Sequence, residues 1–268
     1  MESIFQFNTL YVVESLPDSE IQTGQILYED IVRRSSEKTG LHHTKLLKLD
    51  NKNSFIEGLK TIELYTKKGF HPFIHFEIHG DNQKNGLILK SGEIIYWSEL
   101  ASLTRQINII TNNNLVVSLA TCYGAYFLTE IKIREAAPFC GCVATTGILF
   151  EDEIITRFTI FFETLFETTN FDMAVDRLNN TDGLQYKFKF ITAEELFEDL
   201  VMTMTNENFN PSHLKYKSWT NRLTKTLKNN VIFQSVPKKK LKDIVRGQID
   251  KKGQSFKSVL KKSFLLSK

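Results

Sequence analysis

Long hydrophobic runs are absent from this sequence, and cysteines are few. No uninterrupted apolar stretch approaches the roughly 18 residues that a membrane-spanning helix needs. The first residues do not follow the basic-then-apolar pattern of a secretory signal peptide. The chain of 268 residues has only three cysteines, an odd number that argues against a disulfide framework and is typical of a reducing cytoplasm. We therefore expect a soluble, cytoplasmic protein without a membrane span.

Signatures of several ligand-binding modules are missing as well. No Gly-x-Gly-x-x-Gly follows the first predicted strand, so a nucleotide-binding flavodoxin-like domain is poorly supported. Cys140 and Cys142 are separated by a single residue, whereas zinc sites prefer two to four residues between paired cysteines. We favour a packed strand over a zinc site for this pair.

The charges are distributed unevenly along the chain. Residues 210–268 contain 16 Lys and Arg but only 2 Asp and Glu, which leaves 18 basic and 29 acidic residues in the rest. Two parts of opposite charge suggest a body and an appendage with different roles. We expect one domain over residues 1–205 and a basic, partly helical extension over residues 206–268.

Strand-like and helical patterns alternate through the first part of the chain. The strand-like segments cover residues 9–14, 44–49, 70–78, 115–120, 138–145 and 186–191. Helical spacing of apolar residues appears between them, and residues 85–96 are typical of a hairpin that turns at Ser91 and Gly92. This alternation predicts an α/β fold in three layers, with a mostly parallel sheet and helices on both faces.

Two of the predicted strands end on chemically active side chains. The run from residue 73 ends at His79 and Gly80, and the run from residue 115 ends at Cys122. In an open α/β sheet, active groups gather just beyond the carboxyl ends of the strands. A histidine beside a cysteine can take the thiol proton and so produce a nucleophile. This placement predicts a Cys–His site.

The backbone around these two residues adds to the prediction. The N–H groups of Gly80 and Cys122 could hold the oxyanion that forms when a thiolate attacks a carbonyl group. Gly80 has no Cβ and would let the chain approach a substrate closely. Cys122 opens a turn into a helix predicted at residues 126–134, whose N-terminus would favour a thiolate.

At these positions the sequence resembles the caspase-like cysteine peptidases, and most of all their CHAT branch. The matching features are His-Phe-Glu-Ile-His-Gly at 75–80, the hairpin Leu-Lys-Ser-Gly-Glu-Ile at 89–94 with Glu-Leu at 99–100, and the hydrophobic strand at 115–122. The resemblance covers roughly residues 9–200. It implies a caspase-like fold with a Cys–His dyad and no metal or organic cofactor. His79 would be the acid and base, and Cys122 the nucleophile.

The sequence departs from the caspases proper in two places. Ala-Thr-Cys-Tyr-Gly at 120–124 replaces Gln-Ala-Cys-Arg-Gly, so the glutamine that helps to bind a substrate aspartate is absent and strict cleavage after Asp is not expected. Only a few residues around 135–137 stand where caspases keep their processing linker. We do not expect activation by cleavage there.

The substrate pocket and the extension are less well defined by the sequence. Thr145, Thr146, Glu151 and Asp152 lie on the expected substrate side, and an acidic wall would favour a basic residue before the scissile bond. Alternatively, the two acids simply begin a helix. The extension is a solvated arm, a contact for a regulatory partner, or a segment that covers the active site. Nucleic acid is a weak candidate because no motif of a nucleic-acid module is present.

Two functions follow from this sequence. The first is a cysteine endopeptidase, a hydrolase that cleaves a specific protein or peptide substrate through a thioester at Cys122. The alternative is a catalytically inactive scaffold with a caspase fold, whose basic extension binds a partner.

Overall fold

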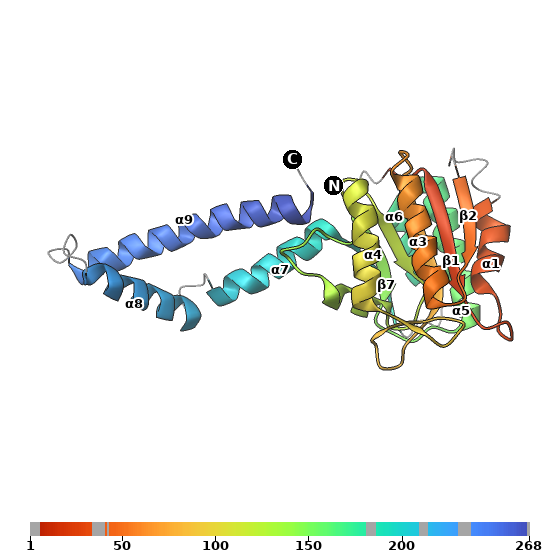
Figure 1. The fold of residues 1–268 in the computed structure, drawn as a ribbon, viewed down its shortest axis with the longest axis horizontal. Helices are drawn as coiled ribbons and strands as arrows, with labels where there is room; N and C mark the ends of the chain where they lie inside the picture. Colours follow the sequence, from red (N-terminus) through yellow and green to blue (C-terminus); the bar gives the residue numbers. More distant parts are fainter. Residues whose placement is uncertain are drawn as a thin grey trace. The chain divides into compact units, whose positions relative to one another are not determined.

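The computed structural model describes residues 6–33, 41, 43–180, 186–208, 214–229 and 237–266 (Figure 1). Contacts divide the chain into two units. One comprises Met1–Lys132 and Ala136–Ala193, and the other Ile133–Glu135 and Glu194–Lys268. The first unit contains the sheet, and the second contains helices.

The first unit is an α/β fold with an eight-stranded, mostly parallel sheet, as the sequence predicts. Six strands lie in the order β2 (His43–Lys48), β1 (Thr9–Ser15), β3 (Pro72–Gly80), β6 (Val116–Leu119), β7 (Gly141–Thr145) and β8 (Phe188–Thr192). The first five are parallel, and β8 runs antiparallel to β7. Every residue of β1 is buried, as expected for an inner strand covered on both faces. A hairpin of β4 (Gly86–Ile88) and β5 (Ile94–Tyr96) pairs with the end of β3.

Helices cover both faces of this sheet. His75 of β3 packs on Phe158 and Phe162 of α5 (Glu151–Thr168), whereas the next residue, Phe76, stacks on Phe55 of α3 (Lys52–Thr66). Because successive strand residues point to opposite faces, α5 and α3 lie on opposite sides. Figure 1 shows α4 (Trp97–Ile110) beside α3. The short α1 (Thr23–Leu27), its π-helical continuation η1 (Tyr28–Val32) and α6 (Phe171–Asn179) contact α5.

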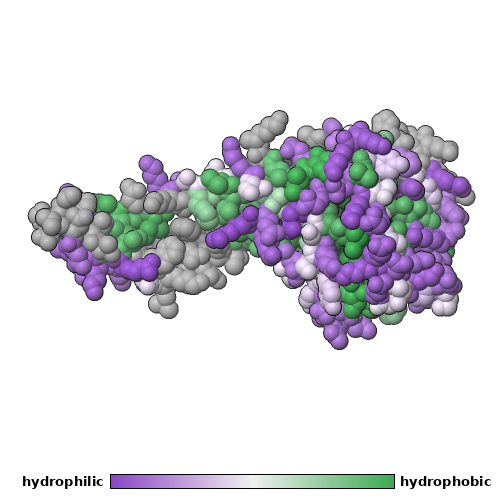
Figure 2. Space-filling model, in the orientation of Figure 1, coloured by the Kyte–Doolittle hydropathy of each residue, from purple (hydrophilic) through white to green (hydrophobic). Residues whose placement is uncertain are grey.

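The core on the α5 side is rich in phenylalanine. Phe73 of β3 contacts the rings of Phe161, Phe162 and Phe171, with centroids 5.6 to 6.4 Å apart. All four side chains are fully or almost fully buried. Burial of one such ring stabilises the fold by about 1.5–3 kcal/mol. Hydrophilic residues cover much of the visible surface of this unit (Figure 2).

The second unit consists of α7 (Ala193–Asn208), α8 (Leu214–Lys228) and α9 (Lys238–Phe264). Tyr216 of α8 packs against Val245 and Ile249 of α9. Lys257 and Lys261 of α9 pair with glutamates of α7 at 2.6 Å. These contacts group α7 with the helices that follow it. No helix in the described ranges is long and apolar enough to cross a membrane.

Candidate active site

A pocket lies where the order of the strands reverses. β1 has β2 on one side and β3 on the other, so the chain winds away from β1 in both directions. Ligands of open α/β folds bind at such a switch point, beyond the carboxyl ends of the strands. Four segments line the pocket, and each follows or ends a parallel strand: residues within 16–23 after β1, 77–79 of β3, 120–122 after β6, and residues within 149–154 after β7.

His79 and Cys122 both line this pocket, so the structure brings together the two residues that the sequence singles out. The adjoining backbone is tightly packed. A Cβ added to Gly80 would lie 1.9 Å from the carbonyl oxygen of Cys122 and 3.1 Å from the hydroxyl oxygen of Thr121. Gly80 is therefore required because the end of β3 touches the segment after β6. From the sequence we expected glycine here because it would let the chain approach a substrate closely. The structure gives a different reason, which is a close contact between two segments of the protein itself.

Cys122 is held by the loop that follows β7. The backbone N–H of Leu149 donates to the sulfur of Cys122 at 3.3 Å, and the thiol lies 3.8 Å from the carbonyl oxygen of Leu149. The next residue, Tyr123, is left-handed at φ 59°, and its N–H donates to the carbonyl of Gly147 at 2.8 Å. An N–H donor is a suitable partner for a negatively charged sulfur.

The helix expected after Cys122 takes a different form. Residues 126–134 do not form an α-helix; η2 (Gly124–Glu130) is a 3₁₀ helix that begins directly after the left-handed Tyr123. A left-handed residue cannot belong to a right-handed helix, so the geometry at Tyr123 separates Cys122 from η2. The N–H of Leu149, and not a helix N-terminus, is therefore the backbone donor at the sulfur.

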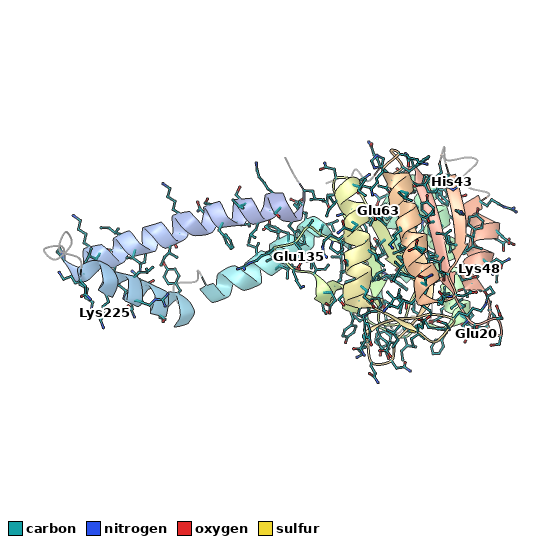
Figure 3. The ribbon with its side chains drawn as sticks, viewed as in Figure 1. Glu20, His43, Lys48, Glu63, Glu135 and Lys225 are labelled. Carbon is teal, nitrogen blue, oxygen red and sulfur yellow. The ribbon has the colours of Figure 1, made fainter. Side chains whose placement is uncertain are left out.

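His79 has a carboxylate partner that the sequence does not reveal. The Nε2 atom of His79 lies 2.5 Å from a carboxylate oxygen of Glu20. Glu20 comes from the loop after β1 (Figure 3). The loop is fixed at Pro17, whose carbonyl accepts from the Glu20 N–H at 3.0 Å and from the Gln22 side chain at 2.9 Å. With Nε2–H donated to Glu20, the Nδ1 atom is the nitrogen left to take up a proton.

A signal for Glu20 does exist in the sequence, although it is weak. Glu20 follows the first predicted strand, which ends at residue 14, by six residues. Parallel strands that are neighbours end at the same edge, so a polar residue after β1 can meet a histidine at the end of β3. That β1 and β3 are neighbours is a property of the sheet and cannot be read from spacing along the chain.

Beneath the pocket lies a second, fully buried histidine. The Nε2 atom of His75 lies 2.8 Å from Glu77, and its Nδ1 atom lies 2.6 Å from the hydroxyl of Ser118. Glu77 also accepts a hydrogen bond of 2.9 Å from Thr23. Because both ring nitrogens of His75 have partners and the side chain is inaccessible, His75 is a structural residue.

The N–H groups expected to hold an oxyanion belong to Gly80 and Cys122, two residues that lie against each other. The backbone N–H of Cys122 has no hydrogen-bond partner within the described parts of the chain. Gly80 lies against Cys122, as described above. An unpaired N–H beside a nucleophile is the kind of donor that an oxyanion requires. The use of these two groups as an oxyanion hole stays a prediction.

Of the four residues expected on the substrate side, Thr145, Thr146 and Asp152 do not line the pocket. Thr145 is buried, and its hydroxyl donates to the carbonyl of Lys187 and accepts from the N–H of Gly147. Thr146 and Asp152 are exposed. Leu149, Glu151 and Ile154 line the pocket from this part of the chain instead. Glu151 is also the first residue of α5, so it both lines the pocket and begins a helix, which the sequence left as alternatives.

Neither of the other two cysteines lines the pocket. Cys142 is completely buried in β7, and burial raises the pKa of its thiol far above the ordinary value. None of the three cysteines, all of which are described, forms a disulfide. Among the described residues no group of three or more His, Cys, Asp and Glu side chains is placed to hold a metal ion.

Comparison with known proteins adds no assignment: no protein-family model matches the chain, and no curated protein matches its sequence. The fold and the pocket therefore define the class of protein by themselves. It is an α/β-sheet protein with a cysteine and a histidine in one pocket at the carboxyl edge of a parallel sheet.

Proposed function

We propose that this protein is a cysteine endopeptidase that hydrolyses a peptide bond of a specific protein substrate. The observation that supports it most is the shared pocket of His79 and Cys122 at the switch point of the sheet. The resemblance of residues 75–80 and 89–94 to caspase-like peptidases of the CHAT branch points to the same chemistry.

The reaction has two steps. First, His79 accepts the thiol proton, the sulfur of Cys122 attacks the carbonyl carbon of the scissile peptide, and His79 then protonates the departing amine as the C–N bond breaks. This leaves a thioester on Cys122. In the second step His79 takes a proton from water, the hydroxide attacks the thioester, and the C–S bond breaks as the thiol is reprotonated. The N–H groups of Cys122 and Gly80 stabilise the oxyanion in both steps.

Glu20 has the role of a positioning residue in this mechanism. Its carboxylate accepts the Nε2–H of His79, which fixes the tautomer and leaves Nδ1 as the base. The same carboxylate stabilises the positive charge that His79 acquires when it takes the thiol proton. The sulfur keeps the Leu149 N–H as its donor while it is negatively charged.

The proposal is tested with Cys122→Ala and His79→Ala. Purified wild-type protein and each variant are incubated with a peptide library, and the products are identified by mass spectrometry. We expect cleavage by the wild type and a loss of at least about 100-fold in each variant, since acid–base catalysis alone contributes about 10²–10⁴. Cys142→Ala is the control, because Cys142 lies outside the pocket. Unchanged cleavage in either active-site variant ends the proposal.

A second candidate, a non-catalytic scaffold, is favoured by the surface of α9. Phe256 and Val259 are 40% and 62% exposed there, beside Lys257 and Lys262. Figure 2 shows hydrophobic residues among hydrophilic ones on the visible face of the second unit, which contains α9. Apolar and basic side chains together suit a protein partner. The scaffold predicts that Cys122 does not react with a thiol-directed peptide probe at neutral pH, and that deletion of residues 210–268 abolishes partner binding.

A further inference from the structure

Among the residues that the structure describes, those lining the pocket beside Cys122 include acidic and apolar side chains but no Lys or Arg. From this lining we infer that the pocket takes a Lys or Arg side chain of the substrate, at the residue whose carbonyl group Cys122 attacks. This inference rests on the proposed function, because it assigns the substrate of the same site.

Three glutamates give the pocket its charge. Glu20 comes from the loop after β1, Glu77 from β3 and Glu151 from the start of α5. His79 carries the one ionisable side-chain nitrogen among the described lining residues, and it is hydrogen-bonded to Glu20. Carboxyl groups outnumber ionisable nitrogens in this lining by three to one, so the lining favours cations over anions.

Glu77 is the most deeply buried of the three glutamates. Its side chain is 1% exposed, and its oxygens accept hydrogen bonds from His75 and Thr23. No Lys or Arg nitrogen of the described chain lies within 4.0 Å of Glu77. A buried carboxylate without a cation is costly, and a bound ammonium or guanidinium group would offset that cost.

The rest of the lining suits the stem of a long side chain. Leu16 and Leu149 are buried apolar residues, and Ile21 and Ile154 extend the apolar wall. Lys and Arg bury their methylene stems against apolar surface and keep the charged end at a polar group. An apolar side chain would use these walls but leave Glu77 without a cation.

Two further residues fit a cationic side chain. Ala120 contributes only a methyl side chain to the lining. The Thr121 hydroxyl oxygen is buried and, in the part of the chain that the structure describes, has no hydrogen-bond partner. Buried hydroxyls normally have a partner, and the N–H groups of a bound Lys or Arg would supply one.

The test compares substrates that differ only in charge at this residue. Peptide reporters carry Lys or its uncharged analogue norleucine, Arg or its uncharged analogue citrulline, and Asp as the opposite charge. We expect kcat/KM for Lys or Arg to exceed that of the matched uncharged analogue by roughly 10- to 100-fold, since loss of one partner of a buried charge pair is costly. Equal or faster cleavage of the uncharged or Asp peptides overturns the inference.

Variants at the start of α5 connect the preference to the pocket. Glu151→Lys places a cation in the lining, and Asp152→Lys makes the same charge change one residue away, outside it. Both residues lie in the first turn of α5, so the effect on the helix N-terminus is matched. We expect Glu151→Lys to reduce the preference for the charged peptides at least tenfold and Asp152→Lys to change it less than threefold. A preference that is unaffected by Glu151→Lys contradicts the inference.

A binding measurement separates failure of the inference from failure of the proposed function. Cys122→Ala protein is titrated with labelled peptides that contain either Arg or citrulline, and the fluorescence anisotropy is followed. Tighter binding of the Arg peptide without any hydrolysis by the wild type would support the pocket and remove the peptidase. Hydrolysis together with equal affinity for both peptides would keep the peptidase and refute the pocket.

Discussion

Gly80→Ala is the change whose effect the structure predicts most directly. The new Cβ would lie 1.9 Å from the carbonyl oxygen of Cys122 and 2.8 Å from its carbonyl carbon, whereas ordinary contact begins at 3.4 Å. The two segments would have to separate by about 1.5 Å. Both atoms belong to the backbone, so no change of rotamer relieves the overlap. Hydrogen bonds hold both sides, since the Asp81 N–H donates to the carbonyl of Gly86 at 2.9 Å and the Ala120 N–H donates to the carbonyl of Phe76 at 3.0 Å.

The expected cost follows from this geometry. Overpacking of a core costs about 1–3 kcal/mol, and we expect Gly80→Ala at or above the upper end because no side chain can move aside. A displacement of about 1 Å in an active site lowers the rate by about 100-fold. We therefore expect Gly80→Ala to lose about 3 kcal/mol of unfolding free energy and, if the protein is a peptidase, at least about 100-fold in kcat/KM.

Urea unfolding of the wild type and the variant, followed by circular dichroism, measures the stability. Gly247→Ala in α9 is the control, because a Cβ there meets no atom within 4 Å. Replacement of a glycine inside a helix by alanine stabilises it by roughly 0.5–1 kcal/mol. If Gly80→Ala is as stable as the wild type, β3 does not end against Cys122 and the reasoning about the site is wrong.

Three further predictions concern His79, the buried ring of Tyr11 and the core. Glu20→Gln should lower kcat up to about 100-fold with little change in KM, because the carboxylate orients His79. Glu20→Asp should recover part of the rate, and a kcat of Glu20→Gln equal to that of the wild type removes the positioning role. Burial, with a smaller contribution from Tyr65, raises the pKa of Tyr11 to about 12. The protonated, neutral form of Tyr11 therefore stabilises the fold fully below pH 10, and this contribution is lost as the pH rises toward 12. Between pH 9 and 11, the unfolding free energy of Tyr11→Phe should decline less than that of the wild type. Phe158→Ala should cost about 3–5 kcal/mol in urea unfolding, and a loss below 1 kcal/mol would contradict its place in the core.

The fold class and the two central site residues could be predicted because their signals are local. Apolar runs with strand-like composition indicate β3 and β6, and alternation with helical spacing indicates a parallel sheet. A residue at the end of a predicted strand has a known position in any such sheet, whichever strands are its neighbours. His79 and Cys122 could therefore be placed at one edge from the chain alone.

The partners of these residues depend on which strand ends are neighbours, and only the tertiary structure decided that. Glu20 reaches His79 because β1 lies beside β3, and Leu149 donates to Cys122 because the loop after β7 folds back over the end of β6. Thr146 and Asp152 lie in or near the expected loop but outside the pocket lining, whereas Glu151 contributes to it. Spacing along a chain determines which residues end a strand, but contacts between distant segments determine which side chains meet.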